Sequence, residues 1–329
     1  MKILHIIPSI HPRYGGPSKA IIEMTKHLKK QGIDCEIATT HFYNEKPLKS
    51  KYVKTHSFKS YLGEYKASPK LFYWLSKNIK KYDLIHIHSV FCFPTFIAAR
   101  IAIKNKKPYI VRTIGQLYKW TLENRNKTIK KTYLKLLERK TLEKANRIHF
   151  TTEDEKNNIE LKLNNKKSYI LPLGTEPDKQ ITKKKFNELF PELKNKEIIL
   201  FLSRIHPKKG LDILIPPLKE FLNNKRILVI AGGGKKEYIK KLKEIIKRNN
   251  LEKNIIFLGP VKGEKKSAIF QHSEFFILPS HTENFGISVI EAMNAKTPVL
   301  ISENVGIAND IKKENAGIVF QLNEKSIEK

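Results

Sequence analysis

The sequence is poor in cysteine and has no long apolar run. Its two cysteines, Cys35 and Cys92, exclude a disulfide framework in a chain of 329 residues and favour a reducing compartment. The apolar stretch at residues 2–8 is too short for a signal peptide, and no small-residue cleavage site follows it. No segment reaches the roughly 20 apolar residues of a membrane-spanning helix. We expect a cytoplasmic protein that is soluble or peripheral to the membrane.

Acidic residues are also scarce, with 32 against 63 basic residues and a net charge of +31. The net charge is +22 over residues 1–150 and +9 over residues 151–329. Only nine of the basic residues are arginine, the side chain that reads bases and phosphates most specifically. The charge indicates either a lysine-rich composition or an anionic partner. A nucleic-acid-binding protein is an alternative that rests on charge alone, because no helix-turn-helix, zinc-ligand or RNA-binding aromatic signature is present.

Strand and helix patterns alternate along the whole chain, which predicts an α/β fold with parallel sheets. In the first half, strands are predicted at 2–8, 35–39, 84–88, 109–112, 147–151 and 168–171, with helices at 20–31, 96–103 and 128–145. In the second half, strands are predicted at 198–203, 226–231, 255–258, 275–278 and 299–301, with helices at 211–222, 235–249, 267–272 and 285–295. Turn chemistry at 172–177 and a polar stretch at 178–196 separate two domains, 1–173 and 174–329.

Glycine turns and cations stand where such sheets bind ligands. Gly15 and Gly16 lie between a predicted strand and helix, where helix amides can hold a phosphate or simply form a turn. The segment is not a G-x-G-x-x-G dinucleotide motif. Arg204 ends a strand and Lys209 begins the next turn, so both are candidates to bind a phosphate group or are ordinary surface cations.

Two glutamates follow the strand at 275–278. Glu283 lies in the loop, where a carboxylate can accept hydrogen bonds from sugar hydroxyls. Glu291 lies about two turns into the following helix. Its apolar neighbours Ile287, Ile290 and Met293 indicate that this helix is largely buried, so an unpaired acid there is unexpected.

With these motifs the chain resembles retaining GT-B glycosyltransferases of the bacterial family-4 type (glycosyl transferases group 1), which build cell-surface glycans. The resemblance covers roughly residues 2–320. The matching segments lie at residues 12–18, 203–212, 258–261 and 283–291. The resemblance implies two Rossmann-like domains with parallel sheets facing across a cleft, the first on the acceptor side and the second binding a nucleotide sugar.

The resemblance also implies roles for individual residues. Arg204 and Lys209 would bind the donor diphosphate and neutralise the charge that develops on the leaving group. Glu291 would hold the ribose hydroxyls of the nucleotide. Gly16 would let its loop approach the phosphates. These roles make Arg204 and Lys209 candidate catalytic residues as well as donor-binding ones.

The donor sugar would lie next to Glu283, the third candidate catalytic residue. The backbone amides of Asn284, Phe285 and Gly286 would complete the cradle around the sugar. Retaining relatives are thought to react on one face of the sugar, so that the leaving phosphate helps to deprotonate the acceptor. No Asp-x-Asp motif occurs, so neither a metal ion nor another cofactor is expected.

The acceptor side departs from the family pattern. Relatives commonly carry His-Gly or Arg-Gly where this chain has Ile114-Gly115. Arg112 and His88 are therefore the candidate acceptor-side residues. His86 and His88 share one strand face, but two histidines without further ligands are not a zinc site.

The end of the chain is a second departure, because relatives continue for roughly fifty more residues and brace the first domain with a final crossing helix. The resemblance implies that this helix is lacking here. The implied function is transfer of a sugar, with retention and without metal, from a nucleotide-diphosphate sugar to a glycan or lipid-linked acceptor. The pathway would be lipopolysaccharide or exopolysaccharide biosynthesis at the inner face of the plasma membrane. A nucleotide-sugar epimerase of the same fold is the other alternative.

The basic helix predicted at 128–145 adds an expected partner. It carries six cations and favours peripheral association with an anionic membrane, since each cation near such a surface contributes about 1 kcal/mol. A solvated basic helix is the other interpretation. No specific nucleic-acid partner is expected.

Overall fold

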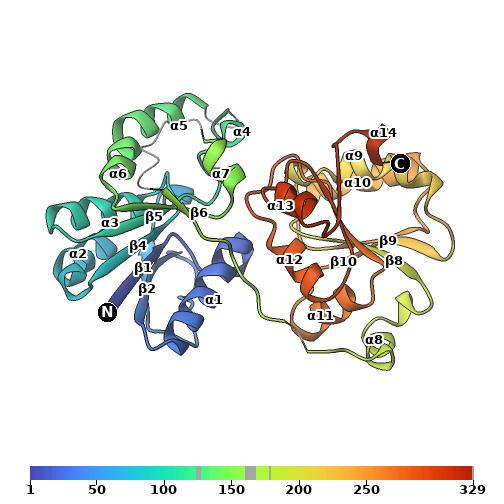
Figure 1. Ribbon diagram of the computed structural model, residues 1–329, viewed down its shortest axis with the longest axis horizontal. Helices are drawn as coiled ribbons and strands as arrows, with labels where there is room; N and C mark the ends of the chain where they lie inside the picture. Colours follow the sequence, from blue (N-terminus) through green and yellow to red (C-terminus); the bar gives the residue numbers. More distant parts are fainter. Residues whose placement is uncertain (124–126, 160–167, 178, 328–329) are drawn as a thin grey trace. The chain divides into compact units, whose positions relative to one another are not determined.

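A computed structural model describes residues 1–123, 127–159, 168–177 and 179–327 (Figure 1). The chain divides into two compact units, Met1–Leu173 and Gly174–Lys329. Each unit contains one parallel β-sheet with helices on both faces, as the alternation of the sequence predicts. No helix in the described ranges combines the length and the apolarity needed to cross a membrane.

The first unit has a seven-stranded sheet in the order β3-β2-β1-β4-β5-β6-β7. Its strands are β1 (Lys2–Ile7), β2 (Asp34–Phe42), β3 (Thr55–Ser60), β4 (Leu84–His88), β5 (Tyr109–Arg112), β6 (Arg147–Phe150) and β7 (Ser168–Ile170). Its helices are α1 (Gly16–Lys30), α2 (Pro69–Asn78), α3 (Phe93–Lys104), α4 (Lys119–Glu123), α5 (Lys127–Tyr133), α6 (Arg139–Lys144) and α7 (Glu153–Asn157). A π-helical turn, Leu134–Glu138, joins α5 to α6.

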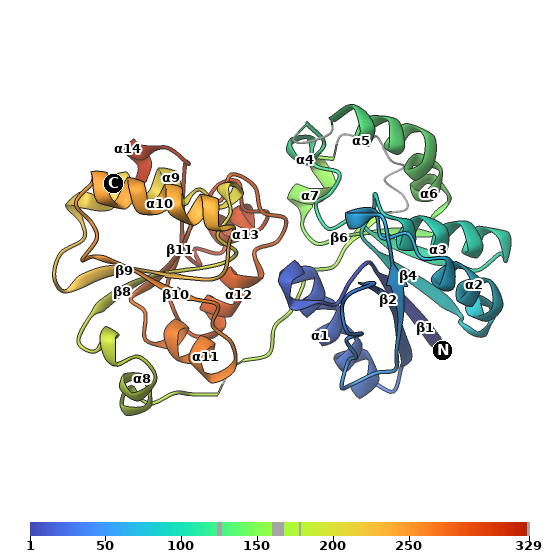
Figure 2. The ribbon, with the colours of Figure 1, turned by 180° about the vertical axis from the view of Figure 1, so that it is seen from behind.

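Side chains alternate between the two faces of this sheet. Ile3 and Ile7 of β1 pack with Ile21 of α1. Leu4 and Ile6 belong instead to the core formed with α2 and α3. The sheet is therefore covered on both sides, with α1 on one face and α2 and α3 on the other (Figure 2).

The second unit has a six-stranded sheet in the order β10-β9-β8-β11-β12-β13. Its strands are β8 (Glu197–Leu202), β9 (Arg226–Ala231), β10 (Ile255–Gly259), β11 (Phe275–Leu278), β12 (Val299–Ser302) and β13 (Ile318–Phe320). Its helices are α8 (Lys183–Leu189), α9 (Leu211–Leu214), α10 (Lys236–Arg248), α11 (Gly263–Gln271), α12 (Ile287–Asn294), α13 (Ala308–Lys313) and α14 (Glu324–Ile327). Residues 328–329, where the sequence ends, lie outside the described residues.

Several predicted elements need correction. The helix predicted at 20–31 begins at Gly16, because Pro17 is well suited to a first helical turn. The helix predicted at 211–222 is only the short α9, since Pro216 and Pro217 interrupt it and a 3₁₀ turn follows. The polar stretch 178–196 contains α8. The edge strand β3, the helices α2, α4, α7 and α13 and the strand β13 were not predicted.

Both sheets have a point at which the strand order reverses. In the first unit it lies between β1 and β4, and in the second between β8 and β11. Loops that leave neighbouring strands in opposite directions open a crevice there, and ligands of α/β proteins bind at the carboxyl ends of these strands. We therefore expect ligands to bind at the loops after β1, β4, β8 and β11.

Candidate functional site

The reversal point of the second unit brings together two of the residues named from the sequence. Lys209 ends a 3₁₀ turn, Pro207–Lys209, after β8, and Glu283 lies in the loop after β11. The Nζ of Lys209 donates a hydrogen bond to Oε2 of Glu283. The Lys209 side chain is 6% exposed and that of Glu283 is 25% exposed, so the carboxylate still reaches solvent.

Two further cations surround this ion pair. Arg204, two residues after the end of β8, is exposed, and Lys208 is half-buried. Burial alone would raise the pKa of the Glu283 carboxyl, but the charges of Lys209, Lys208 and Arg204 lower it below its ordinary value. Burial, together with the neighbouring cations and against the attraction of Glu283, lowers the pKa of Lys208 to about 8. The site is a net-positive edge able to bind an anion. Sequence reasoning missed Lys208, which only its place beside Lys209 could have suggested.

Close backbone packing fixes this edge. Gly210 has φ 68°, and a Cβ at this position would collide with the carbonyl oxygen of Pro279, at the end of β11. The amide of His281 donates to the carbonyl of Lys208 at 2.9 Å. The loops after β8 and β11 are thus in direct contact, and glycine is required where they meet.

The loop that carries Glu283 leads into α12. Asn284 donates its backbone amide to Oε1 of Glu283 at 3.1 Å. Phe285 is buried, and Gly286, at φ 84°, is the residue that precedes the helix. The structure therefore places residues 283–286 together at the N-terminus of α12, where backbone amides attract negative charge.

Glu291, in the middle of α12, does not face solvent. Its carboxylate accepts a hydrogen bond from Nζ of Lys266, on α11, and its side chain is 7% exposed. The predicted burial of the helix is correct, and Lys266 is the partner that the sequence did not reveal. Glu291 lies two turns from the Glu283 loop, on a neighbouring part of the same unit.

In the first unit, Gly16 is the first residue of α1. The preceding Tyr14 receives a hydrogen bond from Nζ of Lys66 at 2.7 Å. Lys66 is 2% exposed, and its ammonium lies over the rings of Tyr14 and Phe42. The loop before Gly16 is therefore fastened to the sheet by a buried cation.

The two acceptor-side candidates are both buried. His88 is 0% exposed and Arg112 is 1% exposed. Nδ1 of His5 and Nε2 of His88 are 3.0 Å apart, and ligand atoms of His5, His86 and His88 all lie within 4.8 Å of one another. The structure thus adds the third histidine that the sequence did not indicate.

These histidines are neutral at physiological pH. Burial lowers the pKa of His5 to about 3 and takes the pKa values of His86 and His88 well below the ordinary value. The nearby guanidinium of Arg112 lowers the last two further, and the same positive charge opposes the binding of a metal cation. Burial lowers the pKa of Arg112 itself to about 10.

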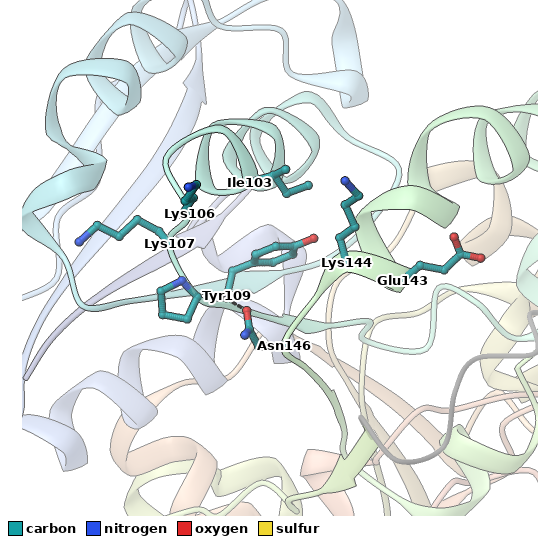
Figure 3. Close-up of a pocket in the computed structure, with 8 residues that line it drawn as sticks. Ile103, Lys106, Lys107, Tyr109, Glu143, Lys144 and Asn146 are labelled. Atoms are coloured by element: carbon teal, nitrogen blue, oxygen red, sulfur yellow. Dashed lines mark hydrogen bonds between the residues drawn. The ribbon is translucent and has the colours of Figure 1, made fainter.

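A surface pocket of the first unit lies elsewhere (Figure 3). Its lining includes Lys106, Lys107 and Tyr109 at the start of β5 and Lys144 at the end of α6. It is thus at the amino end of β5, whereas the candidate sites are at carboxyl ends of strands. We do not assign it to the functional site.

Two sequence families match the chain, one over each unit. The profile described as Glycosyltransferase Family 4 matches residues 14–179, and that described as Glycosyl transferases group 1 matches residues 182–329. The chain belongs to glycosyltransferase family 4. It is thus a glycosyltransferase by family, as the resemblance implied.

Curated relatives match the glycosyltransferase only in part. A glycosyltransferase from Methanocaldococcus jannaschii is 31% identical over 40% of this chain and 34% of its own length. The 2-deoxystreptamine N-acetyl-D-glucosaminyltransferase of Niallia circulans is 27% identical over 72% of this chain and 63% of its own length. The chain therefore spans less than two thirds of these relatives.

Solved structures show the same fold across the whole chain. Anabaena HepE in complex with UDP and glucose has a TM-score of 0.80 at 17% identity, covering 100% of this chain and 88% of HepE. WaaG, a glycosyltransferase involved in lipopolysaccharide biosynthesis, has a TM-score of 0.77 at 16% identity, covering 99% and 88%. The predicted GT-B class, with two Rossmann-like units, is confirmed.

Proposed function

We propose that this glycosyltransferase moves a sugar, with retention and without a metal, from a nucleotide-diphosphate sugar to a glycan or lipid-linked acceptor. The proposed pathway is the biosynthesis of cell-surface polysaccharide, and the proposed location of the enzyme is the cytoplasm. The observation that carries the proposal is the Lys209–Glu283 pair at the β8–β11 reversal point, with Arg204 and Lys208 beside it. The UDP and glucose bound to HepE support a nucleotide-sugar donor.

The charges of the site suit the two halves of such a donor. Arg204 and Lys209 bind the diphosphate, and Lys208 adds a third positive charge as the leaving group becomes more negative. Glu283 accepts hydrogen bonds from the sugar hydroxyls, and Glu291 accepts them from the ribose. During transfer the anomeric carbon–phosphate oxygen bond breaks and a bond to the acceptor oxygen forms on the same face. The acceptor proton passes to the leaving phosphate oxygen.

A panel of nucleotide diphosphates and nucleotide sugars tests the donor site by thermal shift. A donor present at 100 times its Kd stabilises the chain by about 2.7 kcal/mol. We expect stabilisation by at least one of them, and its loss in Arg204→Ala and Glu291→Ala. Glu244→Ala, which removes an exposed glutamate of α10, is the matched control and should respond like the unsubstituted chain. No shift with any ligand would refute the donor assignment.

We also propose peripheral binding to an anionic membrane through residues 127–144. Within the first unit, α5 and α6 lie on the side opposite α1 (Figures 1 and 2). Ile129 and Leu136 are 68% and 66% exposed, and they stand seven residues apart, about two helical turns. Exposed cations flank them: Lys135, Arg139, Lys140 and Lys144. Exposed apolar side chains among cations are typical of helices that lie in a membrane interface.

Vesicle sedimentation tests this surface. We expect binding to vesicles that contain phosphatidylserine, and weaker binding to phosphatidylcholine alone. The double substitution Ile129→Ser and Leu136→Ser should weaken binding several-fold, because two apolar side chains no longer enter the interface. Leu62→Ser removes a residue of the same unit that is 74% exposed and should leave binding unchanged. Equal binding to both vesicle types would contradict the proposal.

A further inference from the structure

The loop after β4 has a strained backbone at the reversal point of the first unit. Ser89 has φ 98° and Phe91 has φ 61°, and neither is glycine. Residues other than glycine rarely adopt such angles, and they persist only where the surroundings impose them. Strained backbone of this kind gathers at functional sites, and residues 89–91 lie at a carboxyl strand end where ligands bind.

Side chains from two other segments impose this conformation. Oε1 of Gln116, in the loop after β5, accepts hydrogen bonds from the Ser89 hydroxyl and from the Val90 amide, both at 2.7 Å. Oε1 of Glu138 accepts the hydrogen bond of the Phe91 amide at 2.9 Å. Each amide of residues 89–91 is thus satisfied, because Ser89 donates its own to the carbonyl of Arg112.

Glu138 reaches this loop from an unusual place in its helix. It closes the π-helical turn Leu134–Glu138, and its residue is 1% exposed, whereas the following Arg139 and Lys140 are exposed. Single π-helical turns within α-helices frequently mark functional positions. The turn therefore presents a carboxylate inward from a helix whose other face is strongly basic.

The groups around Glu138 offset only part of the cost of burying its negative charge. Burial raises the pKa of Glu138 to about 7, against the opposing effects of the Phe91 amide and of Arg100 on α3. Cys92 and Tyr133 are the other titratable groups near it, together with Tyr109 of β5. Burying such a carboxylate is costly to the fold, and here its hydrogen bond ties it to the strained backbone at Phe91.

We propose that Glu138 is a positioning residue that holds residues 89–91 in the conformation that receives the acceptor of the sugar transfer. The inference rests on the proposed function. It assigns no contact between Glu138 and the acceptor, since the carboxylate is buried beneath the loop. Glu138 acts through the Phe91 amide, and Gln116 adds support through Ser89 and Val90.

Three variants separate this role from ordinary packing. Glu138→Met fills the same space without an acceptor oxygen, and Glu138→Gln retains one. Glu143→Gln is the control, because Glu143 lies on α6, is 52% exposed and pairs with Arg139 at the surface. We expect amide hydrogen exchange of Phe91 to accelerate about tenfold or more in Glu138→Met, and to remain slow in Glu138→Gln and Glu143→Gln.

Kinetics then connect the loop to the reaction. In Glu138→Met, the acceptor KM should rise about tenfold or more while thermal stabilisation by the donor is unchanged, since the donor site lies in the other unit. In Glu138→Gln, which keeps an acceptor oxygen for the Phe91 amide, the acceptor KM should stay close to that of the unsubstituted chain.

Some outcomes would overturn the inference. Unchanged Phe91 exchange in Glu138→Met would show that the carboxylate does not hold the loop. Faster exchange with an unchanged acceptor KM would show that the loop does not serve the acceptor. Failure of the proposed function gives a different result, because the unsubstituted chain would then transfer no sugar and bind no donor. Phe91 exchange is measured without either substrate, so it tests the role of Glu138 independently.

Discussion

At the scale of single residues, charge pairs define the candidate donor site more sharply than sequence motifs do. The sequence indicated Arg204, Lys209, Glu283 and Glu291 as separate points along the chain. It could not indicate that Lys209 pairs with Glu283, because that contact depends on which strands become neighbours. Nor could it pair Glu291 with a lysine, since any of 54 lysines would have served equally well as a partner.

Removing the Lys209 charge should therefore affect transfer more than folding. We expect Lys209→Met to lower kcat by about 10²–10³-fold, as loss of one preorganised charge at a developing anion does. The substitution also leaves Glu283 without its ion-pair partner. Steady-state kinetics with a donor identified by thermal shift would measure the effect. Lys247→Met, at an exposed position near the end of α10, is the control, and an equal loss of kcat in both variants would contradict the assignment.

At the scale of elements, sequence patterns identified buried strands well and edge elements poorly. The apolar runs of β4, β9 and β11 predicted their bounds correctly. The strand β3, Thr55–Ser60, is mostly polar because it lies at the edge of its sheet, so it lacked an apolar run to reveal it. The helix α9 was predicted too long, because its apolar spacing continues past the prolines that end it. The spacing of apolar residues indicates which side chains are buried. It does not indicate where a proline interrupts the hydrogen bonds of the helix backbone.

The contact between the loops after β8 and β11 makes one glycine critical. Gly210→Ala should destabilise the chain by about 2 kcal/mol or more, because Cβ would collide with the Pro279 carbonyl and the backbone has a positive φ. It should also weaken donor binding, since Lys209 is the preceding residue. Urea unfolding and thermal shift with donor would measure the two effects. Gly174→Ala, where a Cβ would meet open space, should change neither, and an unaffected Gly210→Ala would contradict the packing argument.

At the scale of the whole molecule, the two parallel sheets differ in how many polar side chains their buried strands carry. The interior of the first unit includes His5, His86, His88 and His149, whereas the core strands of the second are apolar. The sequence predicted the division into α/β halves because each half alternates between strand and helix. It did not predict the histidine cluster, because His5 and His149 lie far apart along the chain and meet only through the strand order.

Acid should therefore unfold the first unit before the second. The four histidines have folded pKa values below 6.5, about 3 for His5 and about 4 for His149, so their stabilising effect is complete above pH 6.5 and declines as the pH falls. His5 and His149 each lower the free energy of unfolding by about 1.4 kcal/mol per pH unit between pH 6.5 and their folded pKa values.

Two probes can separate the two units in one experiment. Both tryptophans, Trp74 and Trp120, belong to the first unit, so their fluorescence reports that unit, while far-ultraviolet circular dichroism reports both. We expect the two urea transitions to diverge between pH 7.5 and pH 5, with fluorescence changing first. In His149→Gln the fluorescence transition should shift less with pH. Coincident transitions at pH 5 in the unsubstituted chain would contradict this expectation.

The lowered pKa of Lys208 has a chemical consequence. With a pKa of about 8, roughly one amine in ten at this position is unprotonated at pH 7, whereas an ordinary lysine is almost entirely protonated. Only the unprotonated amine is a nucleophile. At the edge where the donor phosphates would bind, Lys208 is therefore expected to react faster with acylating reagents at neutral pH than a lysine of ordinary pKa and equal exposure. The group that adds charge to the site is thus also an expected target for covalent labelling.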